Sequence, residues 1–251
     1  MNHCDDGNRC YHIFYQVCAG LEVGARREAL KLKSSSDYKM LSSESGVLQV
    51  CDGVDDAWEF VQTRKAVTGI KADMDEIVAV IASLLHLGNS VPAYANEDDE
   101  SGPVEISNVD PSVTLGFIAS LIGVDEGLFR NALTLRMQTS GRGSTTAIPL
   151  SAAHTLNNIH ALVKHTYDNL FHYLVLKVNE SHECPATSTA TSFIGILDIF
   201  GFEIMRQNSF EQLCINYANE MLQRQFNEQV FVIEKERYGE EGVDVGEICF
   251  Q

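Results

Sequence analysis

The sequence predicts a mixed α/β fold that is mostly helical. In residues 156–178 and 210–233, apolar side chains recur every three to five positions, which is the spacing of an amphipathic helix. One pattern differs: the apolar run 193–197 has the length and composition of a buried parallel strand. A hydrophobic content of 45% is enough to bury a sizeable core. We therefore expect a helical subdomain that leads into a strand.

The first elements are expected to be two helices joined by an irregular segment. An aromatic-rich helix covers residues 10–19 and ends at Gly20. Residues 31–39, with the serine-rich stretch that follows them, predict an irregular connection. The second helix covers residues 52–67, and its Trp58 is expected in the core rather than against a ligand.

A capping signal opens the next helix. Asp73 and Glu76 have the spacing of a capping box, and the apolar positions that follow continue to Gly88-Asn89, where the helix is expected to end. His86 lies near the apolar face of this helix. We expect it to be a packed, hydrogen-bonded histidine and not a metal ligand.

The middle of the chain predicts a loop and three more helices. Residues 92–108, rich in Pro, Gly and acids, are expected to form a loop, and short helices to follow at 111–122 and 125–134. Residues 180–191, rich in Ser and Thr, predict a linker to the strand. Between them, Ser151 should cap a regular helix with the apolar stripe Leu156, Ile159, Val163, Tyr167, Leu170, Leu174 and Val178.

The residues after the predicted strand carry the clearest functional signal. Asp198 follows the strand directly, at the sheet edge where open α/β proteins bind ligands, and Gly201 comes three residues later. Nucleotide hydrolases use D-x-x-G to sense a terminal phosphate, because the carboxylate reaches Mg²⁺ through its water shell and the glycine lets a backbone N–H approach the γ-phosphate. The pattern alone arises often by chance, so its context matters.

A long helix follows this motif. Asn208 or Ser209 is the expected cap, with Glu211 or Gln212 completing a capping box. No Pro or Gly interrupts residues 209–238, so a rise of about 1.5 Å per residue gives a rod of roughly 44 Å. Its apolar stripe is Phe210, Cys214, Tyr217, Met221, Phe226, Val230 and Ile233.

Together these segments resemble the switch II loop and relay helix of the myosin motor domain. The similarity covers L-D-I-F-G-F-E at 197–203 and N-S-F-E-Q-L-C-I-N-Y-A-N-E at 208–220, then Leu-Gln and Phe-Asn pairs. Weaker similarities at 9–20, 84–89 and 162–171 occur in the order of a myosin. The resemblance implies a slice of a P-loop NTPase motor head with one or more strands of the central transducer sheet.

This resemblance divides the chain into three parts. Residues 1–190 would be most of the upper 50-kDa subdomain. Residues 191–207 would be a strand of the central sheet with the switch II loop. Residues 208–251 would be the relay helix and the start of the lower subdomain.

Individual residues receive roles from the same resemblance. Asp198, Gly201 and Glu203 would be catalytic, with Asp198 and Gly201 binding ATP and Asp198 holding Mg²⁺ through water. Glu203 would pair with a switch I arginine that lies outside this sequence, so we expect Glu203 to be unpaired and solvated unless a local cation replaces it. The start of the relay helix would be Asn208, Ser209, Phe210 and Glu211.

A partner surface is implied between Leu133 and Ser144. A myosin loop at this position touches actin, and here it carries Arg136 and Arg142, whose charge suits an acidic filament. A solvated turn with no partner is an open alternative. Ile159-His160 replaces an Arg-Asp pair common in the family, which puts a salt bridge there in doubt.

The isolated chain is not expected to hydrolyse ATP. No Gly-Lys dipeptide occurs, so there is no G-x-x-x-x-G-K-[ST] loop, and Gly141-Arg142-Gly143-Ser144 is expected to be a surface turn. We expect an internal piece of an actin-activated Mg-ATPase motor. The alternative is a degenerate myosin-like module that binds a partner such as actin without turnover.

Composition excludes other classes of function. A net charge of −17 argues against nucleic acid and anionic membranes as partners. The seven cysteines form no C-x-x-C pair, which predicts reduced thiols. No apolar run approaches the roughly 20 residues of a membrane span. We expect a cytoplasmic, cytoskeletal protein whose partners are the actin filament and the remainder of the motor head.

Overall fold

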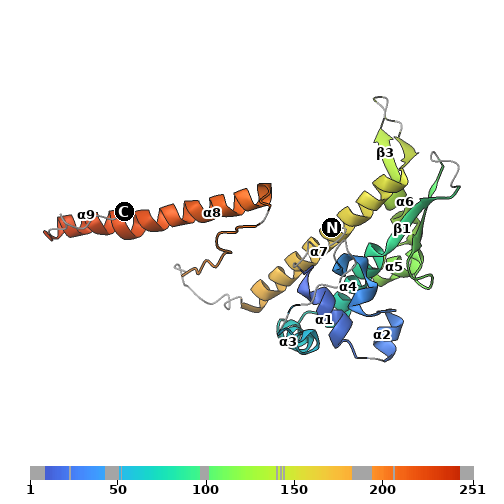
Figure 1. The fold of residues 1–251 in the computed structure, drawn as a ribbon, viewed down its shortest axis with the longest axis horizontal. Coiled ribbons are helices and arrows are strands. Elements are labelled where there is room, and N and C mark those ends of the chain that lie inside the picture. Colours follow the sequence, from blue (N-terminus) through green and yellow to red (C-terminus); the bar gives the residue numbers. More distant parts are fainter. Residues whose placement is uncertain are drawn as a thin grey trace. The chain divides into compact units, whose positions relative to one another are not determined.

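The computed structural model describes residues 9–22, 24–42, 51, 53–96, 102–139, 141, 143, 145–182, 194–205 and 207–243. The chain divides into two compact units, residues 1–186 and 187–251. The first unit holds several helices and two hairpins, and the second holds a long helix that follows an irregular segment (Figure 1). The described residues are therefore mostly helical with small sheets, as the sequence predicts.

Side-chain caps open several helices of the first unit. The carboxylates of Asp55, Asp73 and Asp125 accept hydrogen bonds from the first N–H groups of the helices that follow them, and Ser151 Oγ accepts from His154 N at 3.3 Å. The helices are α1 (His12–Gly20), α2 (Ala25–Ala29), η1 (Ser35–Asp37), η2 (Lys39–Leu41), α3 (Asp56–Gly69), α4 (Met74–Gly88), α5 (Leu115–Leu121), α6 (Glu126–Thr134) and α7 (Ala152–His182). The helices predicted from 10, 52, 73, 111, 125 and 151 are confirmed, although α3 and α5 each begin four residues later than predicted. Most of the predicted linker lies outside the described residues.

Two antiparallel hairpins complete the first unit. Strand β1 (Ser90–Tyr94) pairs with β2 (Val104–Asn108), and β3 (Leu135–Thr139) pairs with β4 (Thr145–Pro149). The prediction that 92–108 is only a loop is wrong, because the ends of this stretch pair with each other. Proline obscured the strand signal, but every strand of a two-stranded sheet is an edge strand, where proline is tolerated.

Helix α4 supplies the centre of the core. Its Ile81, Leu84 and Leu85 are almost fully buried, and α7 contributes the buried Ile159 to the same cluster. Helix α1 packs closely on α3 because Gly20 has no side chain; a Cβ there would lie 2.4 Å from the Cβ of Phe60. This core is built from non-adjacent segments of the first unit.

His86 is packed and hydrogen-bonded, which confirms the prediction. It is 3% exposed, and its Nε2 lies 2.8 Å from the carbonyl oxygen of Leu30. Tyr38 and Phe117 contact the ring edge-to-face. Burial lowers the pKa of His86, because desolvation disfavours the charged imidazolium.

The prediction that Trp58 lies in the core is wrong. Helix α3 begins at Asp56, four residues later than expected, and Trp58 is 58% exposed. The buried positions of α3 are Phe60 and Val67. Because helical residues rotate by about 100° per position, Trp58 points roughly 160° away from Phe60.

The strand predicted at 193–197 is not formed in the second unit. Phe193 lies outside the described residues, and residues 194–205 have no regular secondary structure. Ile194 and Ile196 are 97% and 95% exposed. A strand is stable only when a neighbouring strand satisfies its backbone hydrogen bonds, and the described part of this unit offers none.

The predicted long helix is confirmed, with one local change. It consists of α8 (Phe210–Asn227), the π-helical segment η3 (Glu228–Val232) and α9 (Ile233–Glu240). No residue of these three segments is buried. None of the helices in the described ranges is long and apolar enough to span a bilayer.

Candidate functional site

The loop that carries the D-x-x-G motif is open. Asp198 and Gly201 are both exposed. The Gly201 N–H donates to no other described residue, and a Cβ added at Gly201 would have no atom within 4 Å. Packing against the described residues of this unit therefore does not explain the glycine, and none of them accepts from its N–H.

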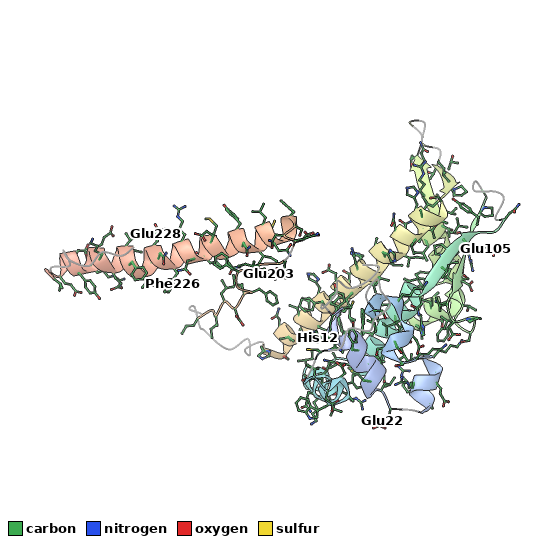
Figure 2. All side chains as sticks on the ribbon, in the orientation of Figure 1. His12, Glu22, Glu105, Glu203, Phe226 and Glu228 are labelled. Atoms are coloured by element: carbon green, nitrogen blue, oxygen red, sulfur yellow. The ribbon has the colours of Figure 1, made fainter. Side chains whose placement is uncertain are left out.

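Two side chains of α8 hold the end of this loop. The backbone N–H of Glu203 donates to Asn216 Oδ1 at 2.8 Å, and Asn216 Nδ2 donates back to the Glu203 carbonyl at 2.9 Å. Gln212 Nε2 lies 3.5 Å from Glu203 Oε2. Figure 2 labels Glu203 on the loop that runs beside α8. The amide of Asn216 thus fixes the Glu203 peptide groups against the second turn of the helix.

This arrangement corrects one expectation. The sequence predicts a solvated Glu203, but the residue is half-buried and its carboxylate faces the amide of Gln212. Within the described ranges, no basic side chain forms an ion pair with it.

The turn between the loop and α8 is also closed by side chains. Met205 N donates to Asn208 Oδ1 at 3.0 Å, and Asn208 Nδ2 donates to the Met205 carbonyl at 3.2 Å. Ser209 caps the helix, because its N–H donates to Gln212 Oε1 at 2.8 Å. Of the alternatives from the sequence, Ser209 with Gln212 forms the capping box.

The neighbouring acid, Glu211, also contacts the cap. The hydroxyl of Ser209 donates to its carboxylate, and this hydrogen bond lowers the pKa of Glu211. Phe210 begins the helix and is exposed. All four predicted relay positions therefore lie at the junction of loop and helix.

The predicted actin-contact residues lie in the first unit. Arg136 is exposed on β3, opposite Ile148 of β4. Arg142 lies outside the described residues. The flanking Gly143 has φ +83°, a conformation typical of a glycine in a tight turn.

The exposed loop is compatible with Mg²⁺ and a nucleotide. Mg²⁺ in such sites takes one or two carboxylates together with phosphate oxygens and water, and Asp198 is an exposed carboxylate. Among the described residues, no group of three or more His, Cys, Asp or Glu side chains could hold a metal ion by itself. Asp198 and the Gly201 N–H fit a metal–phosphate group that brings its own oxygens.

Comparison with known proteins identifies the family. A model of the myosin head (motor domain) family matches residues 3–251. The chain belongs to the myosin head family. It is 36% identical to the Myosin-I heavy chain of Dictyostelium discoideum, over 100% of this chain and 10% of that protein.

Two further relatives agree. The chain is 38% identical to Myosin-1 of Arabidopsis thaliana, over 99% of this chain and 21% of that protein. It is 40% identical to Unconventional myosin-Va of Gallus gallus, over 94% of this chain and 12% of that protein. The chain therefore spans only between 10% and 21% of the length of these three relatives.

Sequence reasoning missed Asn216 and the contact of Gln212 with Glu203. Both residues lie on α8, one turn apart, on the side that faces the loop. The sequence does carry a signal for this contact. Gln212 and Asn216 are amide side chains at i and i+4, so they lie on one face of the helix, and amides can both donate to and accept from backbone groups.

Proposed function

We propose that this myosin segment senses the γ-phosphate of ATP and transmits its presence to a long helix. The paired hydrogen bonds between Asn216 and the Glu203 backbone carry this proposal. They join the Glu203 end of the sensor loop to α8 itself, so this end cannot shift without moving the helix or breaking both bonds.

The loop residues have distinct roles in this proposal. Mg²⁺ neutralises charge on the phosphates during phosphoryl transfer. Asp198 would hold the ion through water, and the Gly201 N–H would donate to a γ-phosphate oxygen. Glu203 would close the site around the attacking water, with its backbone position set by Asn216 and its carboxylate beside Gln212.

The helix suits transmission over distance. The 31 residues from Phe210 to Glu240 are continuously helical and, at about 1.5 Å per residue, span roughly 46 Å. A small tilt at the loop end therefore becomes a larger displacement near α9. The π-helical segment makes the rod less uniform than the sequence predicts, and such segments are frequent at functional sites.

The remaining roles belong to the complete motor. We assign residues 1–190 to the upper 50-kDa subdomain, 191–207 to the central sheet and switch II, and 208–251 to the relay helix and the start of the lower subdomain. The exposed β3–β4 hairpin with Arg136 would face the acidic actin filament. The chain supplies no phosphate-loop lysine, so we assign it no ATP hydrolysis by itself.

Two substitutions in a complete motor domain carrying this sequence test the proposal. Glu203→Ala should permit ATP binding but slow single-turnover hydrolysis by about a hundredfold or more, because the attacking water loses its positioning group. Asn216→Ala should slow hydrolysis less than Glu203→Ala does, because the Glu203 carboxylate remains but loses its backbone anchor, and should lower filament sliding velocity severalfold, because the end of the loop is released from α8.

Gln223→Ala is the matched control. Gln223 is exposed on the same helix, and among the described residues its amide donates only to Asn227 Oδ1, at 3.1 Å. Normal sliding by Asn216→Ala would show that this contact does not transmit the signal. Unchanged hydrolysis by Glu203→Ala would remove Glu203 from the catalytic site.

A further inference from the structure

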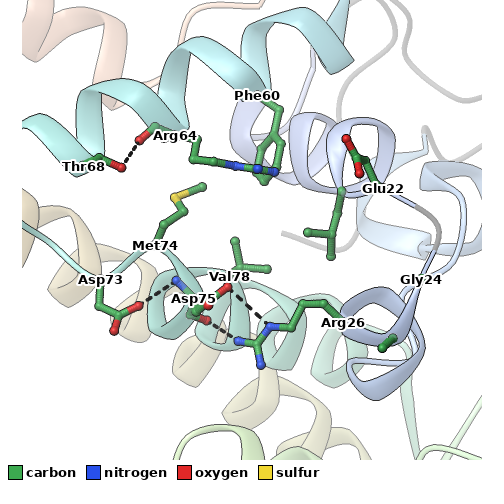
Figure 3. A pocket seen from close by; sticks show the side chains of 12 residues that line it. Glu22, Gly24, Arg26, Phe60, Arg64, Thr68, Asp73, Met74, Asp75 and Val78 are labelled. Carbon is green, nitrogen blue, oxygen red and sulfur yellow. Dashed lines mark hydrogen bonds and ion pairs between the residues drawn. The ribbon is translucent and has the colours of Figure 1, made fainter.

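A pocket in the first unit has no part in the proposed motor cycle. It has a volume of about 510 Å³, within the range of small-molecule sites, roughly 300–1,000 Å³. The end of α1, helix α2, helix α3 and the start of α4 surround it (Figure 3). We propose that this pocket binds a small organic monocarboxylate with an apolar body.

The floor of the pocket suits the apolar body. Leu21 and Met74 are half-buried and line the pocket, and the fully buried Phe60 and Val78 lie beneath them. A ligand that covers Leu21 and Met74 removes apolar surface from water, which favours binding. Methionine also adapts its shape to an aromatic ring.

Arg64 suits the carboxylate. Its guanidinium carbon lies 5.0 Å from the centre of the Phe60 ring, and Figure 3 shows the two side chains together on one side of the pocket. Within the described ranges, no carboxylate or carbonyl oxygen accepts a hydrogen bond from this guanidinium. A guanidinium presents a planar fork of N–H donors that a carboxylate accepts with both oxygens.

The acids of the pocket wall are mostly engaged already. Asp73 Oδ1 accepts from the N–H groups of Asp75 and Glu76, at 2.8 and 3.2 Å. Arg26 donates through Nη2 to the Asp75 carbonyl at 2.8 Å, and its Nε lies 3.6 Å from Asp75 Oδ1. Two arginines line the pocket in the described part of the chain. Arg26 is already bound to Asp75, so Arg64 is the one that can bind a ligand.

Glu22 narrows the ligand class. It is exposed, lines the pocket and has no hydrogen bond or ion pair with another described residue. Its carboxylate repels any anion. Arg64 can offset one negative charge of the ligand, but a second charge would face the acids of the lining without a partner. The pocket therefore favours a monoanion over a phosphate ester or a dicarboxylate.

The test is calorimetric titration of the 251-residue chain with 2-naphthoate and with its neutral isostere 2-naphthamide. Naphthoate should bind saturably at one site. The amide should bind at least about tenfold more weakly, because it is neutral and offers Arg64 one acceptor oxygen in place of two. Equal binding of both compounds, or no saturable binding of naphthoate, would overturn the proposal.

Variants locate the binding. Arg64→Gln should weaken naphthoate roughly tenfold, and Lys65→Gln, the adjacent exposed cation, should leave it unchanged. Ala25→Trp places a large ring at the exposed rim and should block binding without touching the core. Binding that survives both Arg64→Gln and Ala25→Trp lies elsewhere on the chain and contradicts the assignment.

Discussion

The two units of this chain differ in how they are stabilised. The first unit buries a contiguous core of side chains from α1, α3, α4, α5, α6 and α7. The second buries no residue of its helix, and side-chain hydrogen bonds from Asn208, Gln212 and Asn216 fix its loop. The residues proposed to sense ATP lie in this second unit. A segment without its own core changes position at little cost, which suits a switch.

The largest expected effect is a difference in how much a truncated side chain destabilises each unit. Leu85→Ala should destabilise the first unit by about 2–5 kcal/mol, because it leaves a cavity in a fully buried site. Phe226→Ala should change stability by less than about 0.5 kcal/mol, because Phe226 is 54% exposed. Urea unfolding followed by circular dichroism measures both. Equal losses would mean that the second unit has a core of its own.

A proline in α8 tests the second unit as a transmission element. Gln223→Pro in a complete motor domain should cost about 3 kcal/mol of helix stability, because it removes an intrahelical hydrogen bond and clashes with the preceding turn. ATP turnover should persist while filament sliding stops, and Gln223→Ala should behave as the unsubstituted motor. If a motor confirmed to carry Gln223→Pro moved filaments at normal speed, α8 would be excluded as the transmission element.

The smallest expected effect concerns pH and the first unit. Because burial lowers the pKa of His86 in the folded state, the unfolded chain binds this proton more readily. The contribution of His86 to the free energy of unfolding should therefore be fully present above about pH 6.5 and be lost as the pH falls below that value. Among the described charged groups, Asp110 raises the pKa of His86, whereas Lys31 and Lys33 lower it.

Urea unfolding between pH 7 and pH 5 measures this dependence. In His86→Leu the slope attributable to this residue should disappear, whatever the change in stability at neutral pH. An unchanged slope would show that other groups cause the pH dependence.

Local chemistry made much of this protein predictable. The D-x-x-G spacing, the cap at Ser209 and the uninterrupted helix depend on residues close together in the sequence, and the structure contains the cap and the helix. The helix starts at Asp73 and Ser151 were predicted for the same reason. Capping and helical periodicity depend on residues within a few positions of one another, so a single sequence is enough to predict them.

Tertiary structure decided the rest. The β1–β2 pairing, the outward position of Trp58 and the contact of Asn216 with Glu203 each depend on which segments meet in space. The apolar run at 194–197 shows the reverse: its composition favours a strand, but the described residues of its unit offer no strand to pair with, and the run is exposed. Sequence alone determined where the helices capped by Asp73, Ser151 and Ser209 begin, whereas burial and strand pairing depend on partners that are distant in the sequence.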